Sequence, residues 1–485
     1  MKFLQRRDER VRIGPCEIME EKKSTAYYHG ADRVKMQIAY SLGGIPMNLP
    51  WILVSSYLMF FLTDIALVPA AVVSALFLGV RAFDAINDPL IGIMSDRTKS
   101  RWGRYRPWMF VGAIMLIPTL TLLFWAHPDW SVGARTAYAC VLYCFAVVFA
   151  TMWDIPYGAL NSCITPDPTE RASFSSSRIL VSSAACAVGS GVFLPLIAKM
   201  GGAAGDTVGG YVKATLIIAL CTIPFTLICC GKTKEVVYPP KSQKMTPGAM
   251  VKTVVQNPPL LILLIGFFMF GFLSYGRMAV GLYYFTYVVG NAKGFSIYAL
   301  VNGILSGLGS FFGVSLLLRF FKSKRDACIF GYVVQVICNG ALFLIDPAKT
   351  GMTTVLAILL VGGTLNGFVT GMIYGMIPDT VEYGQWKSGV RTDGFVYAIT
   401  SFMNKLGGAV GPALLGMLLA TAGYIGGVEV QTESALSMIN ICMNLVPTIL
   451  AAVAIIALTF YKLDNKLYAQ IRQELDAREA EKASE

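Results

Sequence analysis

The sequence predicts an all-α polytopic membrane protein with twelve transmembrane helices arranged in two six-helix halves. Apolar residues make up 55% of the 485 positions and charged residues only 14%, whereas soluble proteins carry about 25% charged residues. The chain also contains twelve apolar stretches of spanning length. No alternating strand pattern is present, and lipid cannot satisfy the open edges of a sheet. A water-soluble fold is therefore excluded.

Each apolar stretch is long enough for a helix that crosses a bilayer. They lie at residues 38–63, 70–95, 107–126, 136–160, 174–198, 212–231, 258–288, 295–318, 326–345, 352–378, 393–422 and 436–461. In the tenth, glycines recur every four residues from Gly363 to Gly375. Such a row of small residues predicts close packing against another helix.

The connections between these stretches predict the orientation. Of the 40 Lys and Arg residues, 31 fall in the two tails and in alternate loops, and five fall in the loops between. Basic residues accumulate on the cytoplasmic side, so both termini are expected in the cytoplasm and the chain in the cytoplasmic (inner) membrane. The formal charge of +11 then marks topology, and nucleic acid is not an expected partner.

A basic, proline-containing segment divides the chain. We expect a cytoplasmic N-terminal tail at 1–37, a six-helix bundle at 38–231, a cytoplasmic linker at 232–257, a second bundle at 258–461 and a cytoplasmic tail at 462–485. Two such halves around a site near the bilayer midplane are typical of secondary transporters.

Enzymatic and metal chemistry find little support in the residue types. The eleven cysteines lie mostly in apolar runs, where Cys behaves as a small hydrophobe, and there are two histidines. No metal-ligand spacing or nucleophile–base arrangement occurs in the spans. We expect no enzyme activity and no cofactor.

Charged residues inside the spans are few, and charge in a membrane is costly and usually functional. They are Arg81, Asp84, Asp88, Asp154, Arg178, Arg277 and Lys405. These seven residues are the candidates for the transport chemistry, although the sequence suggests no role for Arg277.

Span two carries three oxygen-bearing side chains on one helical face. Asp84, Asn87 and Asp88 stand at i, i+3 and i+4. Adjacent carboxylates repel unless a cation or a proton neutralises them. The pattern indicates a cation or proton site. The alternative is a structural network in which Arg81, one turn earlier, pairs with Asp84.

Span four offers a carboxylate beside aromatic rings. Asp154 follows Trp153 and precedes Pro156, and Thr151 lies one turn earlier. A carboxylate accepts paired hydroxyl hydrogen bonds, and a ring covers the apolar face of a sugar, so this group suits a polyol. The alternative is a salt bridge to Arg178, and both can hold in different states. Lys405 in span eleven is either a counter-ion for the span-two carboxylates or a competitor of the cation for them.

Several segments resemble the glycoside–pentoside–hexuronide:cation symporter family of the major facilitator superfamily. The similarity covers about residues 36–465. Its most specific part is DAINDPLIG at 84–92 with DRTKSRWGRYRPW at 96–108, followed by WDIPYGAL at 153–160 and FMNKLGG at 402–408. The resemblance implies the fold of that superfamily.

The resemblance also implies residue roles. The family's Na⁺ ligands match Asp84, Asn87, Asp88 and Thr151; its sugar-binding carboxylate matches Asp154, its span-five arginine Arg178 and its span-eleven lysine Lys405. Asn48 stands where galactoside carriers have an aspartate, which is more like glucuronide-type members. The candidate substrate contacts are Asp154, Arg178, Asn48, Trp153, Tyr157 and Ser401, and the candidate coupling residues are Lys405 and Arg81.

The resulting hypothesis is import of a glycoside, pentoside or hexuronide by symport with Na⁺ or H⁺ through alternating access. We expect a monomer in the lipid bilayer, with a monovalent cation and a small-molecule glycoside or uronide as partners. The alternatives are a carrier of the same fold for a non-sugar organic solute or a glucuronide conjugate, or a channel or receptor.

Overall fold

The protein is described from a computed structural model. The described residues are 30–165, 168–201, 207–236, 254–321, 323–345, 347–388, 393–463 and 465–484. The expected N-terminal tail at 1–37 lies largely outside them, as do residues 237–253 of the expected linker.

Within these ranges all regular elements are helices. They are α1 Gly30–Leu42, α2 Ile45–Phe60, η1 Phe61–Ile65, α3 Ala70–Arg97, α4 Arg106–Leu123, α5 Val132–Ile164, α6 Pro168–Met200, α7 Thr207–Leu220, α8 Ile223–Lys232, α10 Pro258–Tyr283, η2 Tyr284–Val288, α11 Ala292–Phe320, α12 Lys324–Leu344, α13 Pro347–Thr350, α14 Met352–Ser388, α15 Asp393–Thr421, α16 Glu433–Asn440, η3 Ile441–Leu445, α17 Val446–Thr459 and α18 Asn465–Ser484. The η elements are single π-helical turns.

The predicted spans correspond to these helices in order. In the described part of the chain, eleven helical segments are long and apolar enough to cross a membrane. The 29-residue helix α11 takes the place of the eighth predicted span. The first helical segment begins at Gly30 rather than at residue 38, and α14 continues to Ser388, ten residues beyond the predicted limit of 378. Apolarity marks the part of a helix that faces lipid, whereas the helix itself continues into polar sequence.

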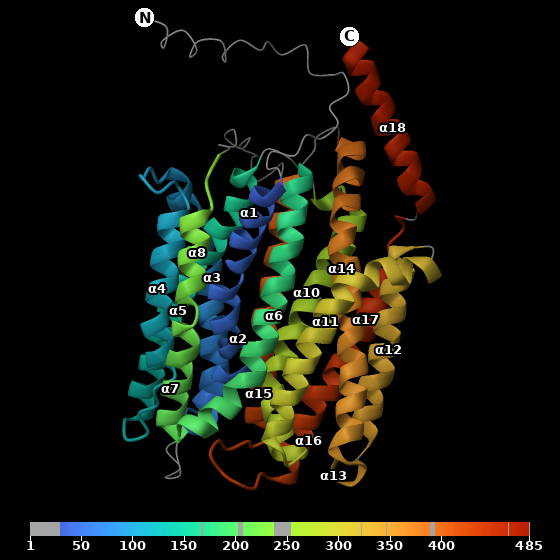
Figure 1. Ribbon diagram of the computed structural model, residues 1–485. Coiled ribbons are helices and arrows are strands. Elements are labelled where there is room, and N and C mark those ends of the chain that lie inside the picture. The colour runs from blue at the N-terminus through green and yellow to red at the C-terminus, as the bar shows by residue number, and fades with distance from the viewer. Residues whose placement is uncertain are drawn as a thin grey trace, which may run out of the picture.

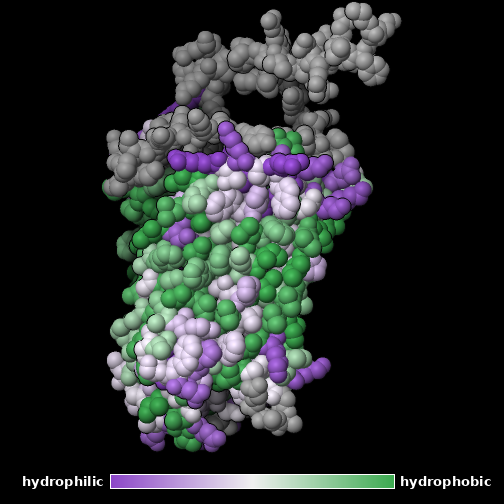
Figure 2. All heavy atoms as spheres, turned by 90° about the vertical axis from the view of Figure 1, so that its left-hand side faces the viewer, coloured by the Kyte–Doolittle hydropathy of each residue, from purple (hydrophilic) through white to green (hydrophobic). Residues whose placement is uncertain are grey.

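The helices stand side by side along one long axis, with α1 to α8 on one side and most of α10 to α17 on the other (Figure 1). The start of α1 and the helix α18 lie at the same end of the bundle (Figure 1), which we call the terminal end; the other is the distal end. Figure 2 shows a broad apolar band around the middle of the molecule, bounded by hydrophilic side chains towards both ends. This is the surface expected of a protein that faces lipid.

The buried core is divided unevenly between the two ends. One large cluster of buried apolar residues includes members of both halves, among them Tyr57, Phe61, Tyr283 and Phe295. Two smaller clusters each belong to one half, one around Trp153 and Phe174 and the other around α10, α12 and α14. The halves therefore share a core in one region and have separate cores in another.

Glycine permits the closest helix contacts. A Cβ at Gly367 would lie 2.1 Å from the Ser306 carbonyl oxygen, and one at Gly407 would lie 2.0 Å from the Phe268 carbonyl oxygen. Side chains at these positions would separate α14 from α11 and α15 from α10. The predicted packing role is confirmed for Gly363 and Gly367, whereas a Cβ at Gly375 would have no neighbour within 4 Å.

The C-terminal tail forms a helix, α18, and one face of it docks on α14. Ile471 is buried, Arg472 pairs with Glu382 at 2.9 Å, and Trp386 donates to Glu474 at 2.6 Å. The hydrogen bond from Trp386 lowers the pKa of the Glu474 carboxyl. The tail is therefore not solvated all round.

Candidate transport site

The polar face of α3 meets α5 near the middle of the bundle. The hydroxyl of Thr151 donates to Asp88 at 3.1 Å and lies 3.4 Å from an Asp84 carboxylate oxygen. Asp84 and Asn87 are each 7% exposed and Thr151 is 5% exposed. The i, i+3, i+4 spacing on α3 turns these side chains to one face, and the packing of α5 supplies the hydroxyl. Asp84 and Asp88 of α3 and Thr151 of α5 therefore converge.

Two basic side chains neutralise this cluster. The Lys405 ammonium on α15 donates a hydrogen bond to Asp88, and Arg81 lies 3.6 Å from Asp84. The first contact joins residues 317 positions apart in the chain, so it crosses from one half to the other. The second stays within α3. Both pairings were considered from the sequence, and the structure contains both of them.

Asn87 lies on the same face of α3 as Asp84 and Asp88, but its amide group donates no hydrogen bond to another described residue. Its amide nitrogen is shielded from solvent and has no hydrogen-bond partner among the described residues. Oxygen atoms are the ligands that hard cations prefer. The carboxylates, the Thr151 hydroxyl and the Asn87 amide oxygen are therefore a chemically suitable donor set for a monovalent cation.

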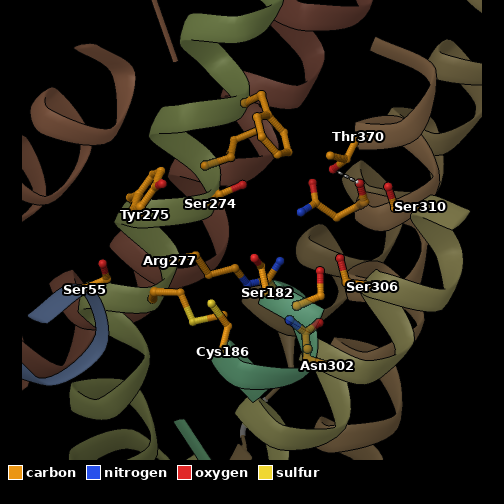
Figure 3. Close-up of a pocket in the computed structure, with 18 of the residues that line it drawn as sticks. Ser55, Ser182, Cys186, Ser274, Tyr275, Arg277, Asn302, Ser306, Ser310 and Thr370 are labelled. Carbon is orange, nitrogen blue, oxygen red and sulfur yellow. Dashed lines mark hydrogen bonds between the residues drawn. The ribbon is translucent and has the colours of Figure 1, made fainter. Parts of the chain in front are cut away.

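A cavity of about 820 Å³ lies beside this cluster, between the halves. Its walls include Asn48, Asp154, Arg178 and Ser182 from α2, α5 and α6, and Tyr275, Arg277, Asn302 and Thr370 from α10, α11 and α14. Figure 3 shows polar side chains from several helices turned into this space. Ligand pockets are commonly about 300–1,000 Å³, so the cavity has room for a small glycoside.

The N-terminal half contributes an ion pair to the cavity wall. Arg178 lies 3.3 Å from Asp154, and its guanidinium stands 4.3 Å from the ring centre of Tyr157. Asn48 donates to the Ser182 hydroxyl at 3.1 Å. The Asp154 side chain is 41% exposed, so it retains open hydrogen-bonding positions while paired.

Three other predicted substrate contacts lie away from the cavity. The Trp153 indole is buried and donates to the Gly43 carbonyl oxygen at 3.1 Å. The Tyr157 hydroxyl donates to the Tyr40 carbonyl oxygen at 2.6 Å, and its ring supports Arg178 from behind. Ser401 is exposed and is not among the lining residues. Trp153 and Tyr157 instead hold α5 against α1.

Sequence reasoning missed a carboxylate at the distal end. Asp64, in η1, lies just past the predicted end of span one. It accepts hydrogen bonds from Tyr424 at 2.7 and 2.8 Å, and also from Tyr287. Thr63 beside it lies 2.7 Å from the Tyr283 hydroxyl. Tyr283 and Tyr287 lie far from Asp64 along the chain, with a separation of 223 positions for Tyr287, and nothing in the local sequence links them to it.

Comparison with known proteins identifies the family of this chain. Residues 39–465 match the family described as MFS/sugar transport protein. The chain is 32% identical to the isoprimeverose transporter of Lactiplantibacillus pentosus, over 90% of this chain and 91% of that one. It is 30% identical to the putative glycoside/cation symporter YagG of Escherichia coli (strain K12), over 92% and 96%.

A solved structure with the same fold is that of a D-xylose-proton symporter. It is 10% identical, covers 89% of this chain and 97% of its own, and superposes with a TM-score of 0.64. The twelve-helix plan of the major facilitator superfamily predicted from the sequence is confirmed. The chain is a multi-pass membrane transporter rather than an enzyme, and it belongs to the MFS/sugar transport protein family as a member of the glycoside–pentoside–hexuronide:cation symporters.

Proposed function

We propose that this protein imports a glycoside, pentoside or hexuronide into the cell by symport with a monovalent cation, through alternating access. Both termini lie in the cytoplasm in this proposal, because the basic residues concentrate at the terminal end. The bundles at 38–231 and 258–461 are the two moving halves, and one chain is the transport unit.

The observation that carries the proposal is the shared use of Asp88. Its carboxylate accepts from Thr151 within the N-terminal half and from Lys405 in the C-terminal half. A cation bound among Asp84, Asn87, Asp88 and Thr151 would supply the positive charge that Lys405 now supplies. Lys405 is then free to leave, so cation binding changes a contact between the halves. Na⁺ suits this oxygen donor set, and protonation of one carboxylate is the alternative.

The substrate side of the proposal rests on the cavity wall. Asp154 carries open acceptor positions for sugar hydroxyls, while Arg178 fixes its orientation. Asn48 and Ser182 extend the polar surface along the same wall. The cation cluster and this wall share α5, on which Thr151 and Asp154 stand one turn apart. Binding at one site therefore biases the position of the other, and the coupling is reciprocal.

Uptake into proteoliposomes tests the coupling. A panel of labelled glycosides, pentosides and hexuronides is offered with an inward Na⁺ gradient at constant pH, and separately with a pH gradient without Na⁺. We expect one gradient to drive accumulation. Asp88→Asn should reduce that accumulation more than about tenfold, because the neutral amide neither attracts a cation nor holds Lys405. Counterflow without a gradient should be less affected.

The control is Asp129→Asn, which removes an exposed carboxylate from a loop. It should accumulate substrate like the wild type. Unchanged gradient-driven uptake by folded Asp88→Asn would remove the α3 cluster from the coupling mechanism. Labelled product with altered chemistry, or flux without counterflow, would contradict transport by a carrier.

A further inference from the structure

The basic residues inside the spans outnumber the carboxylates available to them. Three are paired: Arg81 with Asp84 at 3.6 Å, Arg178 with Asp154 at 3.3 Å and Lys405 with Asp88. The fourth, Arg277 on α10, has no carboxylate partner among the described residues. Asp64 is held by tyrosine hydroxyls. One positive charge in the transport region is therefore left without a counter-charge from the described residues.

Arg277 lines the cavity from the side of the C-terminal half. Its Nε and Nη2 atoms are shielded from solvent and have no hydrogen-bond partner in the described part of the protein. Figure 3 shows the side chain extending from its helix into the space between the helices. Shielding two guanidinium nitrogens of a partly buried arginine from solvent without giving them acceptors is costly, and a ligand with acceptor oxygens would offset that cost.

The polar groups on the same wall are also unsatisfied. The Ser274 hydroxyl, the Asn302 amide oxygen, the Gln335 amide nitrogen and the Asn339 amide oxygen are shielded and lack partners among the described residues. All four residues line the cavity with Arg277. Buried polar atoms are normally hydrogen-bonded, and unpaired donors and acceptors that line one cavity together with a guanidinium have the form of a binding site before its ligand arrives.

The charge of the cavity identifies the class of ligand. Within the described lining, the one carboxylate is Asp154, and it is paired with Arg178. Arg277 therefore leaves the lining with one net positive charge. A guanidinium presents parallel N–H groups that match the two oxygens of a carboxylate. A sugar acid carries such a group together with the hydroxyls that suit Asp154.

We propose that Arg277 binds the carboxylate of the transported substrate and that the cavity consequently selects hexuronides over neutral glycosides of the same size. The assignment rests on the proposed sugar-transport function and makes its substrate class specific. Asp154 and Arg277 stand on opposite walls, so one hexuronide held by both connects the halves across the cavity. Binding of the substrate then favours the state in which the walls approach each other.

Matched ligands test the selection in the wild-type protein. Purified full-length protein is reconstituted into liposomes, and counterflow of labelled methyl glucuronide is measured. Unlabelled methyl glucuronide, methyl glucoside and the corresponding six-carbon sulfonate are added in turn as competitors. We expect the uronide to compete at concentrations roughly 10- to 100-fold below those of the neutral glucoside, as for a charge-assisted bidentate contact. The sulfonate should compete less well than the carboxylate.

Variants test the residue. Arg277→Gln should lose most of the preference for the uronide while its affinity for the neutral glucoside stays within about threefold, and Arg277→Lys should recover part of the preference because it retains the charge. Lys293→Gln, which removes an exposed positive charge from α11, should match the wild type.

The outcomes separate this inference from the function beneath it. Counterflow of the neutral glucoside with no preference for the uronide would overturn the role of Arg277 and leave sugar transport intact. A stronger response to the sulfonate would overturn the carboxylate assignment. Absence of counterflow with every sugar of the panel would instead contradict the proposed function. Because the competition uses wild-type protein, it decides the question even if an Arg277 variant fails to fold.

Discussion

The distal end and the terminal end of the bundle are held together differently. At the distal end, residues of both halves share one core, and rings meet across the boundary, as in Tyr57 with Phe295 and Phe60 with Tyr283. Asp64 adds hydrogen bonds from Tyr287 and Tyr424 of the other half. At the terminal end, ion pairs of the described residues such as Lys324 with Asp379 at 2.8 Å lie inside one half.

This difference identifies the distal end as the closed end of the bundle in this structure. The distal end is closed by burial and by a satisfied carboxylate, whereas at the terminal end each half has a core of its own. Alternating access requires the reverse arrangement to be reachable. The distal contacts must therefore be strong enough to close the cavity and weak enough to separate in each cycle. Lys405 and Asp88 lie between the two regions and can respond to the cation.

Removing the distal carboxylate should have the largest effect. Asp64→Ala leaves the buried Tyr424 hydroxyl and the partly buried Tyr287 hydroxyl without their acceptor, which should destabilise the closed distal end by about 3 kcal/mol and shift the equilibrium roughly 100-fold. The test uses a protein whose single cysteine is Cys186, which lines the cavity. An impermeant thiol reagent added from the distal side should label Cys186 faster in the Asp64→Ala variant than in the same protein with Asp64. Asp129→Ala is the control, and unchanged labelling of Asp64→Ala would show that the aromatic core alone closes this end.

Changing the cavity wall should leave the closure intact and reduce substrate binding. Asp154→Asn replaces one acceptor oxygen with a donor NH2 group and removes the charge that pairs with Arg178, so we expect at least a tenfold loss of substrate affinity. Ligand-induced change in the melting temperature measures this loss. The change induced by the cation should persist, because Asp84 and Asp88 are untouched. Full retention of the substrate-induced change would place the sugar site elsewhere.

A smaller effect is expected from Thr151→Val, which removes one neutral hydroxyl from the cation cluster. The cation concentration for half-maximal stabilisation should rise about three- to tenfold, as expected for one neutral hydrogen-bonding group. Thr119→Val is a matched control, because that buried hydroxyl donates to the Met115 carbonyl oxygen of its own helix at 2.7 Å. Equal behaviour of the two variants would argue against Thr151 as a ligand.

The smallest effect concerns the tail helix at the terminal end. Because Trp386 donates to Glu474, the pKa of Glu474 is lower in the folded protein than its ordinary value of 4.5. Its contribution to docking of α18 is therefore complete above pH 4.5 and is lost as the pH falls through the lowered pKa. Amide hydrogen exchange of α18 should increase selectively over that acidic range. Glu474→Gln should weaken this pH dependence, and Glu429→Gln should leave it unchanged.

Much of the fold followed from local pattern. A span reveals itself through a continuous apolar stretch, because lipid acts on each residue directly, and the helix period places Asp84, Asn87 and Asp88 on one face. The resemblance in the motifs around them supplied the family, which the comparisons confirmed. Helix ends were less predictable, since α1 and α14 continue past the apolar residues that define their spans.

The pairings across the molecule depended on tertiary packing. The sequence by itself determined the helices, the end of the bundle at which basic residues concentrate and the short set of charged residues within the spans. It left open whether Lys405 pairs with the span-two carboxylates, which the contact with Asp88 now shows, and it did not determine that Trp153 would be turned from the cavity or that Asp64 would be held by tyrosines of the other half. Nor did it reveal that Arg277 has no counter-charge among the described residues. Hydropathy and periodicity act within one helix, whereas a charge finds or lacks its partner only when the helices are packed.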